Sequence, residues 1–159
     1  MELDQFDRRL LGALQQDNQQ TGEQLAEAVG LSAAACLRRA QKLREGGVIE
    51  RDVSILSPEA IGRRLTMIVT VALDRQRLHE EEAFIRLMRE AAEVMECYHI
   101  TGGADYVLIL SVADMQAYEA FTRRYFYERY IKRFESMAAL ERVKFSTAVP
   151  MAGGEEVQL

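Results

Sequence analysis

The chain has 159 residues, of which 48% are hydrophobic and 28% are charged, and its net charge is −5. At ~100 to 200 residues per domain this length allows one domain or two small ones, and the apolar fraction excludes a disordered chain. No apolar run approaches the ~20 residues of a membrane helix, and the acidic start differs from a basic signal peptide, so we expect a cytoplasmic protein. Cys36 and Cys97 lack a ligand-like spacing, which disfavours a disulfide or a zinc site.

The first 57 residues predict three helices. Residues 4–14 have the apolar spacing of an amphipathic helix, and a capping box of Thr21 and Gln24 opens a second helix. Gly30 ends that helix, and a third helix is expected over residues 32–44. A helix-turn-helix needs a small residue where its helices meet, a glycine in the turn and a buried apolar residue after it. The sequence supplies these as Ala26, Gly30 and Cys36.

The third helix concentrates positive charge that the negative net charge of the chain conceals. Residues 32–44 contain four basic residues and no acidic ones. One face of the helix is expected to pack (Cys36, Leu37, Ala40, Leu43), and the other is small near the N-terminus and basic beyond it. Small residues let a helix approach the bases of a major groove, and guanidinium groups reach guanine edges or phosphates. A solvated helix face is the alternative reading of a basic cluster taken alone.

Residues 48–56 alternate apolar and polar residues, which predicts a short strand pair or an extended arm. Beyond them the pattern predicts four strands and two helices in the order β-α-β-β-α-β. The strands cover residues 65–73, 94–101, 106–112 and 137–147; one helix covers residues 84–92 and the other opens at the N-cap Asp114. The first strand is nearly all apolar, so we expect it to be buried on both faces.

This element order is that of the ferredoxin-like split βαβ sandwich, in which two helices cover one face of a four-stranded antiparallel sheet. The chain is therefore predicted to be an α+β protein with four parts. They are a winged-type helix-turn-helix domain (1–57), a linker (58–64), a ferredoxin-like domain (65–150) and a disordered tail (151–159). The uncovered sheet face is expected to be buried by dimerisation.

Four stretches of the sequence together resemble a known family. They are LDQFDRRLLGALQQD, the string GLS…CLRR…L…GVI, ECYHITGGADYVLILSVADMQAY, and the ERVK of the last predicted strand. Over residues 3–150 the chain resembles the leucine-responsive/AsnC (Lrp/AsnC) transcription regulators. The resemblance implies an N-terminal domain that binds double-stranded DNA. It also implies a βαββαβ (RAM) domain that forms homodimers, builds octamers or other even assemblies, and binds an effector, usually an amino acid.

The resemblance also implies two sets of site residues. The expected DNA-binding residues are Thr21, Ser32, Ala33, Ala35, Arg38, Arg39 and Lys42. The expected effector-binding residues are Gly102, Gly103, Asp105, Tyr106, Met115, Met137, Ala138 and Ala139. In this reading the Asp105 carboxylate holds the α-ammonium of an amino acid, and glycine-turn N–H groups hold its carboxylate. Without the family, Asp105 is an ordinary turn residue.

The sequence departs from the family pattern at three places. The hairpin turn Gly102–Asp105 lacks the usual second acid and aromatic, and residues 33–35 are alanines where Ser-Pro pairs are usual. Residues 130–133 replace a Gly-Val turn, which favours a longer last helix.

Two alternatives to an amino-acid-responsive regulator stay open. One is an architectural DNA-binding regulator without an effector. The other is an enzyme on the same fold, similar to the siroheme decarboxylases, for which only His99 is available. The sequence contains no nucleophilic triad or phosphate-binding glycine loop. We therefore expect a regulator with no catalytic residues, no metal and no cofactor.

Overall fold

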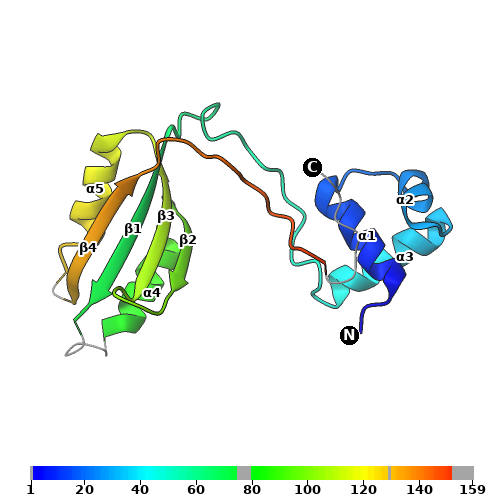
Figure 1. Cartoon of the computed structure of the whole chain (residues 1–159), viewed down its shortest axis with the longest axis horizontal. Helices are drawn as coiled ribbons and strands as arrows, with labels where there is room; N and C mark the ends of the chain where they lie inside the picture. Colours follow the sequence, from blue (N-terminus) through cyan, green and yellow to red (C-terminus); the bar gives the residue numbers. More distant parts are fainter. Residues whose placement is uncertain (1, 75–79, 129, 152–159) are drawn as a thin grey trace. The chain divides into compact units, whose positions relative to one another are not determined.

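The computed structural model describes residues 2–74, 80–128 and 130–151 (Figure 1). The described residues form two compact units, one within residues 2–54 and 144–151 and one within residues 55–143. Residues 144–150, predicted to belong to the second domain, therefore group with the first. The predicted tail is described only at Met151, because residues 152–159 lie outside the described part of the chain. No helix among the described residues is long and apolar enough to cross a membrane.

The first unit contains the three predicted helices. They are α1 (Gln5–Gln16), α2 (Gly22–Val29) and α3 (Ala33–Glu45). The side chains of Asp4, Thr21 and Ser32 cap them, each accepting a hydrogen bond from the backbone N–H three residues on. The turn between α2 and α3 depends on Gly30, whose φ of 79° is a left-handed conformation that glycine adopts without a Cβ clash. The predicted caps Thr21 and Ser32 and the turn glycine are confirmed, whereas the Asp4 cap was not predicted.

The core of this unit is a small apolar cluster contributed by all three helices. Its buried members are Leu10, Leu11, Leu25, Val29, Cys36, Ala40 and Leu43. Helices α2 and α3 approach each other closely at Gly22, where an added Cβ would lie 3.2 Å from Leu37 and 3.3 Å from Ala33. The expected position for a small residue, Ala26, is only half-buried. Leu37 was predicted to pack in the core, but it lies beside Gly22 at the edge of the helix pair and is 54% exposed.

The segment after α3 is an extended arm. Residues 48–57 are all described and none of them is in a strand, so of the two alternatives the structure has the extended arm and not the strand pair. Polar residues hold the start of this arm against α3 instead, because Arg44 forms an ion pair of 2.8 Å with Asp52.

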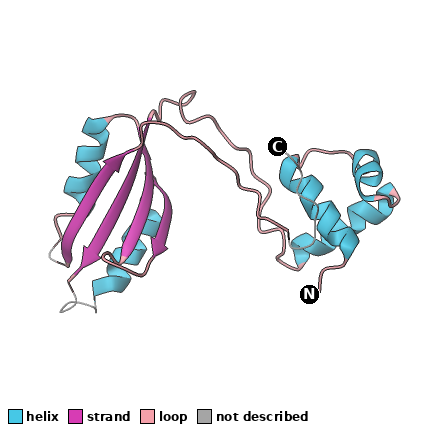
Figure 2. Ribbon diagram, in the orientation of Figure 1, coloured by secondary structure: helices cyan, strands magenta, loops and turns pink. Residues whose placement is uncertain are grey.

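The second unit has the predicted β-α-β-β-α-β order, which confirms the α+β class (Figure 2). Its elements are β1 (Leu65–Leu73), α4 (Glu81–Glu90), β2 (Val94–His99), β3 (Tyr106–Val112), α5 (Met115–Tyr125) and β4 (Ile131–Ala138). The sheet is antiparallel with strand order β2-β3-β1-β4. Side chains of α4 and α5 share one core with β1 and β3, so both helices cover the same sheet face.

Burial alternates along the two central strands, as expected for a sheet covered on one side. On β1 the side chains of Met67, Val69 and Val71 are buried, whereas Ile68 and Thr70 between them are half-exposed. The prediction that this strand is buried on both faces is therefore wrong for the single chain. The uncovered face is rich in apolar side chains, which is why its sequence pattern indicated two buried faces.

The last strand lies earlier in the chain than predicted. The strand was expected at residues 137–147, but β4 ends at Ala138. It pairs with β1, so that Phe134 lies opposite Val71 and Ser136 lies opposite Val69. The hydroxyl groups of Tyr118 and Ser136 form a hydrogen bond. Helix α5 ends at Tyr125 rather than continuing through residues 130–133. The second strand ends at His99 instead of residue 101, and β3 has the predicted bounds.

Candidate DNA-binding surface and ligand site

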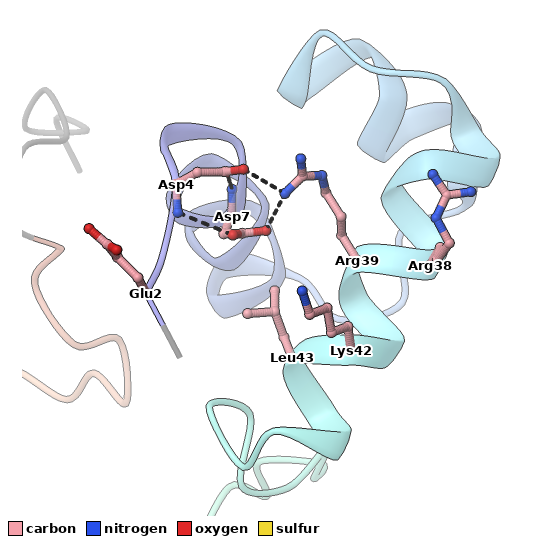
Figure 3. A pocket seen from close by; sticks show the side chains of 7 residues that line it. All are labelled: Glu2, Asp4, Asp7, Arg38, Arg39, Lys42 and Leu43. Carbon is pink, nitrogen blue, oxygen red and sulfur yellow. Dashed lines mark hydrogen bonds and ion pairs between the residues drawn. The ribbon is translucent and has the colours of Figure 1, made fainter.

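The basic residues of α3 separate into exposed and paired groups. Arg38 and Lys42 are exposed, and neither makes an ion pair within the described part of the chain. They are four positions apart, so they share one helix face. Arg39 points toward α1 in Figure 3, while Arg38 points away from it. Among the described basic residues of α3, Arg38 and Lys42 are therefore the two without an ion pair, because Arg39 and Arg44 are both paired.

Arg39 is held by two carboxylates at the start of α1. Its Nη1 atom lies 2.8 Å from Asp4 Oδ2 and 2.7 Å from Asp7 Oδ1, and its guanidinium lies 5.8 Å from the Phe6 ring centroid. These carboxylates raise the pKa of Arg39. The pKa of Asp4 is lowered, chiefly because its carboxylate accepts the Asp7 backbone N–H, with Arg39 adding to the effect. Arg39, one of the predicted DNA-binding residues, thus lies in an intramolecular ion pair with Asp4 and Asp7.

The N-terminal part of α3 is small, as predicted, but a different alanine is exposed. Ala34 is exposed, whereas Ala33 lies against the position of Gly22 and Ala35 is half-buried. Thr21 and Ser32 are exposed N-caps whose hydroxyl oxygens accept helix N–H groups. Each hydroxyl hydrogen remains available for a phosphate oxygen.

The predicted DNA-binding residues did not include Ala34, Leu37 or Gln41, all of which are exposed on α3. Leu37 is exposed on the same face as Arg38, although its apolar type indicated a buried position. An apolar side chain in a major groove can contact the methyl group of thymine. We define the recognition surface as the exposed residues of α3 as far as Lys42 together with its N-cap, namely Ser32, Ala34, Leu37, Arg38, Gln41 and Lys42.

An open cavity of about 690 Å³ lies beside the hairpin turn between β2 and β3. Its lining residues are Ala72, Leu73, Asp74, Gly102, Gly103, Asp105, Lys132 and Arg133. We call this cavity the turn pocket. It contains two carboxylates and two cationic side chains. Lys132 and Arg133 are exposed at the start of β4 and were not predicted, because the sequence pattern extended the preceding helix over them.

Asp105 has a structural contact in the turn pocket. Its Oδ2 atom accepts the Leu73 backbone N–H at 2.7 Å, and its own N–H donates to the Val71 carbonyl at 2.9 Å. Arg133 donates to the Gly103 carbonyl at 3.1 Å, which connects β4 to the glycine turn. Asp105 therefore orders the end of β1 as a turn residue while its carboxylate lines the cavity.

The other predicted effector residues do not line this pocket. Tyr106 is 3% exposed on the core side of the sheet, and its hydroxyl donates to Glu81 at 2.6 Å. The His99 ring stacks on Tyr106 with centroids 4.8 Å apart, a packing role. The remaining predicted residues lie at the opposite end of the sheet, where β1 begins, β4 ends and α5 starts: Met115, Met137, Ala138 and Ala139.

The two units together define a class of protein, a helix-turn-helix DNA-binding unit combined with a ligand-binding βαββαβ unit. Residues 3–44 match the AsnC-type helix-turn-helix domain, and residues 66–149 match the Lrp/AsnC ligand binding domain. The chain belongs to the Lrp/AsnC family of helix-turn-helix transcriptional regulators.

Individual relatives agree with this assignment. An uncharacterized HTH-type transcriptional regulator of Sinorhizobium fredii is 51% identical over 152 residues, 95% of this chain and 90% of the relative. The crystal structure of an AsnC family regulator from Agrobacterium tumefaciens has a TM-score of 0.88 and 35% identity, covering 93% of this chain and 97% of that one. A Neisseria meningitidis regulator in complex with L-Met has a TM-score of 0.88 and 29% identity, covering 94% and 97%. These relatives are regulators, and the chain is likewise a regulator and not an enzyme.

Proposed function

We propose that this protein recognises a specific DNA sequence as a homodimer that inserts two copies of α3 into successive major grooves. The observation that carries the proposal is the recognition surface, where exposed Arg38 and Lys42 follow a small N-terminal turn. Small residues permit close approach to the bases, and the two cations can contact guanine edges or phosphates. The half-sites of such a dimer lie ~34 Å apart, or a multiple of this distance.

The ligand we propose is an amino acid bound at the turn pocket. A zwitterion needs an anionic and a cationic partner close together, and the lining of the pocket includes Asp105 as well as Lys132 and Arg133. The cations on β4 replace the glycine N–H groups as the proposed partners of the ligand carboxylate. The L-Met bound to the Neisseria meningitidis relative supports this class of ligand.

In this proposal, assembly of the subunits couples amino-acid binding to DNA binding. The uncovered sheet face presents Ile68, Val107 and Ile109, which are half-exposed in the single chain. Burial of this face between two copies removes apolar surface from water. We place the amino acid where dimers meet in an octamer or another even assembly. Its binding changes the assembly equilibrium and thereby the occupancy of DNA. DNA binding must then change the affinity for the amino acid by the same factor. The protein acts in the cytoplasm.

The test is a selection of bound duplexes from a random library, followed by binding measurements with and without each of the 20 amino acids. We expect enrichment of a two-fold symmetric sequence, and a change in its affinity with at least one amino acid. No enriched sequence would contradict specific recognition. An enriched sequence whose affinity no amino acid changes would contradict the ligand proposal and favour an architectural regulator.

A further inference from the structure

The two carboxylates that bind Arg39 also form the cap of α1. Asp4 Oδ1 accepts the Asp7 N–H at 2.8 Å, and Asp7 Oδ2 accepts the Asp4 N–H at 3.2 Å. The remaining oxygens, Asp4 Oδ2 and Asp7 Oδ1, face Arg39. This arrangement is a capping box whose side chains are fixed by the backbone before they meet the guanidinium. The carboxylates are therefore preorganised to bind a cation from α3.

The same contacts hold the guanidinium at the side of α3 that faces α1. The Arg39 side chain is 32% exposed and that of Asp7 is 14% exposed, so their ion pair is more protected from solvent than a surface pair. Phe6 adds a cation–π contact. A phosphate that approached Arg39 would have to displace both carboxylates and would be repelled by them.

Three acidic side chains from the start of the chain and three basic side chains from α3 surround one cavity. Glu2, Asp4 and Asp7 line one shallow cavity together with Arg38, Arg39 and Lys42 (Figure 3). Phosphate binding by cations is independent of base sequence, so each cation neutralised within the protein lowers non-specific affinity for DNA.

We infer that the α1 capping box withholds Arg39 from DNA and uses it to set the position of α3, leaving Arg38 and Lys42 as the cationic DNA contacts. Arg39 is then a positioning residue, and Asp4 with Asp7 limits non-specific binding. This inference rests on the proposed DNA-binding function. It assigns different roles to two adjacent arginines that the sequence presents as equivalent.

The experiment measures the affinity of the full chain for a fluorescent 30-base-pair duplex of arbitrary sequence over a range of salt concentrations. The logarithm of the affinity falls with the logarithm of salt, with a slope of about −0.9 for each neutralised phosphate. For each bound subunit we expect Arg38→Ala to reduce the magnitude of this slope by about 0.9, and Arg39→Ala to leave it unchanged.

A second set of variants removes the two carboxylate charges and tests directly whether they withhold Arg39 from DNA. Asn caps a helix as well as Asp does, so Asp4→Asn with Asp7→Asn keeps the cap while releasing Arg39. We expect this variant to bind more tightly at low salt and to gain about 0.9 in slope per subunit, and adding Arg39→Ala to cancel that gain. The control is Glu82→Gln with Glu90→Gln, an equal change of net charge at two exposed positions of α4.

The possible results distinguish failure of the inference about Arg39 from failure of the proposed DNA-binding function. A slope gain in the Asp4 and Asp7 variant that Arg39→Ala reverses supports the inference. An Arg39→Ala slope as shallow as that of Arg38→Ala, or a gain no larger than in the Glu82 and Glu90 control, overturns it while DNA binding stands. Failure of the wild-type chain to bind any duplex contradicts the proposed function itself.

Discussion

Gln15 and Val149 are joined by two hydrogen bonds, although 134 positions separate them in the sequence. The Val149 N–H donates to Gln15 Oε1 at 2.6 Å, and Gln15 Nε2 donates to the Val149 carbonyl at 3.2 Å. One side-chain amide thus satisfies both backbone groups of one residue. Met151 packs against the core of the same three-helix unit. Residues 144–151 are therefore part of the DNA-binding unit, although they continue the chain from the ligand-binding unit.

Replacing Gln15 should release this segment. Each hydrogen bond contributes about 0.5–1.5 kcal/mol, and exposed ones lie near the lower value. We predict that Gln15→Ala increases amide hydrogen exchange at Val149 several-fold, while the exposed neighbour Gln16→Ala leaves it unchanged. Equal protection of Val149 in both variants would show that other contacts hold the segment.

Replacing a glycine by alanine should change the stability of the protein in opposite directions at two positions in neighbouring helices. At Gly22 a new Cβ would crowd Leu37 and Ala33, whereas at Gly12 it would meet nothing within 4 Å. Overpacking costs about 1–3 kcal/mol, and Gly→Ala in an open helix position gains up to about 1 kcal/mol. Urea unfolding should therefore show lower stability for Gly22→Ala and higher stability for Gly12→Ala. A stabilised Gly22→Ala variant would contradict the close approach of α2 and α3.

The two roles of Asp105 can be separated by substitution. Asp105→Asn keeps an oxygen that can accept the Leu73 N–H, and Asp105→Ala removes it, so only the alanine variant should lose about 1 kcal/mol of stability. Both variants remove the charge that we propose for the α-ammonium of the ligand. A thermal-shift screen of the 20 amino acids should therefore give a ligand-induced rise in melting temperature for the wild type only. A rise that survives in Asp105→Asn would mean that the carboxylate charge is not a ligand contact.

Alkaline pH should destabilise the ligand-binding unit through Tyr106. Burial, assisted by the hydrogen bond to Glu81, raises the pKa of this hydroxyl well above its usual value of 10. A group whose folded-state pKa is raised contributes stability below its unfolded pKa and loses it as pH rises beyond that value. We predict that the melting temperature of the wild type falls above about pH 10. The melting temperature of the Tyr106→Phe variant should fall less steeply over the same pH range. Tyr127, which is 77% exposed, provides the control Tyr127→Phe, expected to follow the wild-type curve.

Local patterns predicted most of the fold correctly. Apolar spacing predicted the first helix, and capping residues with the turn glycine predicted the second and third, because capping signals act within four residues of one another. The edge strand β4 was misplaced because it carries Lys132, Arg133 and Glu135, so its composition does not resemble a buried strand. The apolar alternation at residues 137–147 instead belongs mainly to an extended segment whose Leu140 and Val143 are exposed.

The sites were less predictable, because their contacts join distant parts of the sequence. Nothing near Arg39 indicates that Asp4, 35 positions away, will bind it. The cations of the turn pocket come from β4, and the glycines and Asp105 come from the hairpin before α5. The chemistry of each residue could be read from its type, but the side of the helix or the end of the sheet that it occupies required the tertiary structure.

The central claim, that Arg38 and Lys42 on α3 read DNA, is tested most directly with a duplex selected from a random library. Anisotropy titrations at one fixed salt concentration would compare the wild type with Arg38→Ala and Lys42→Ala on that duplex and on a scrambled version. A lost base contact costs about 1–3 kcal/mol, so we predict at least a fivefold loss of affinity on the selected duplex for one or both variants. Unchanged affinity of both variants for the selected duplex would contradict the assignment of α3 as the recognition helix.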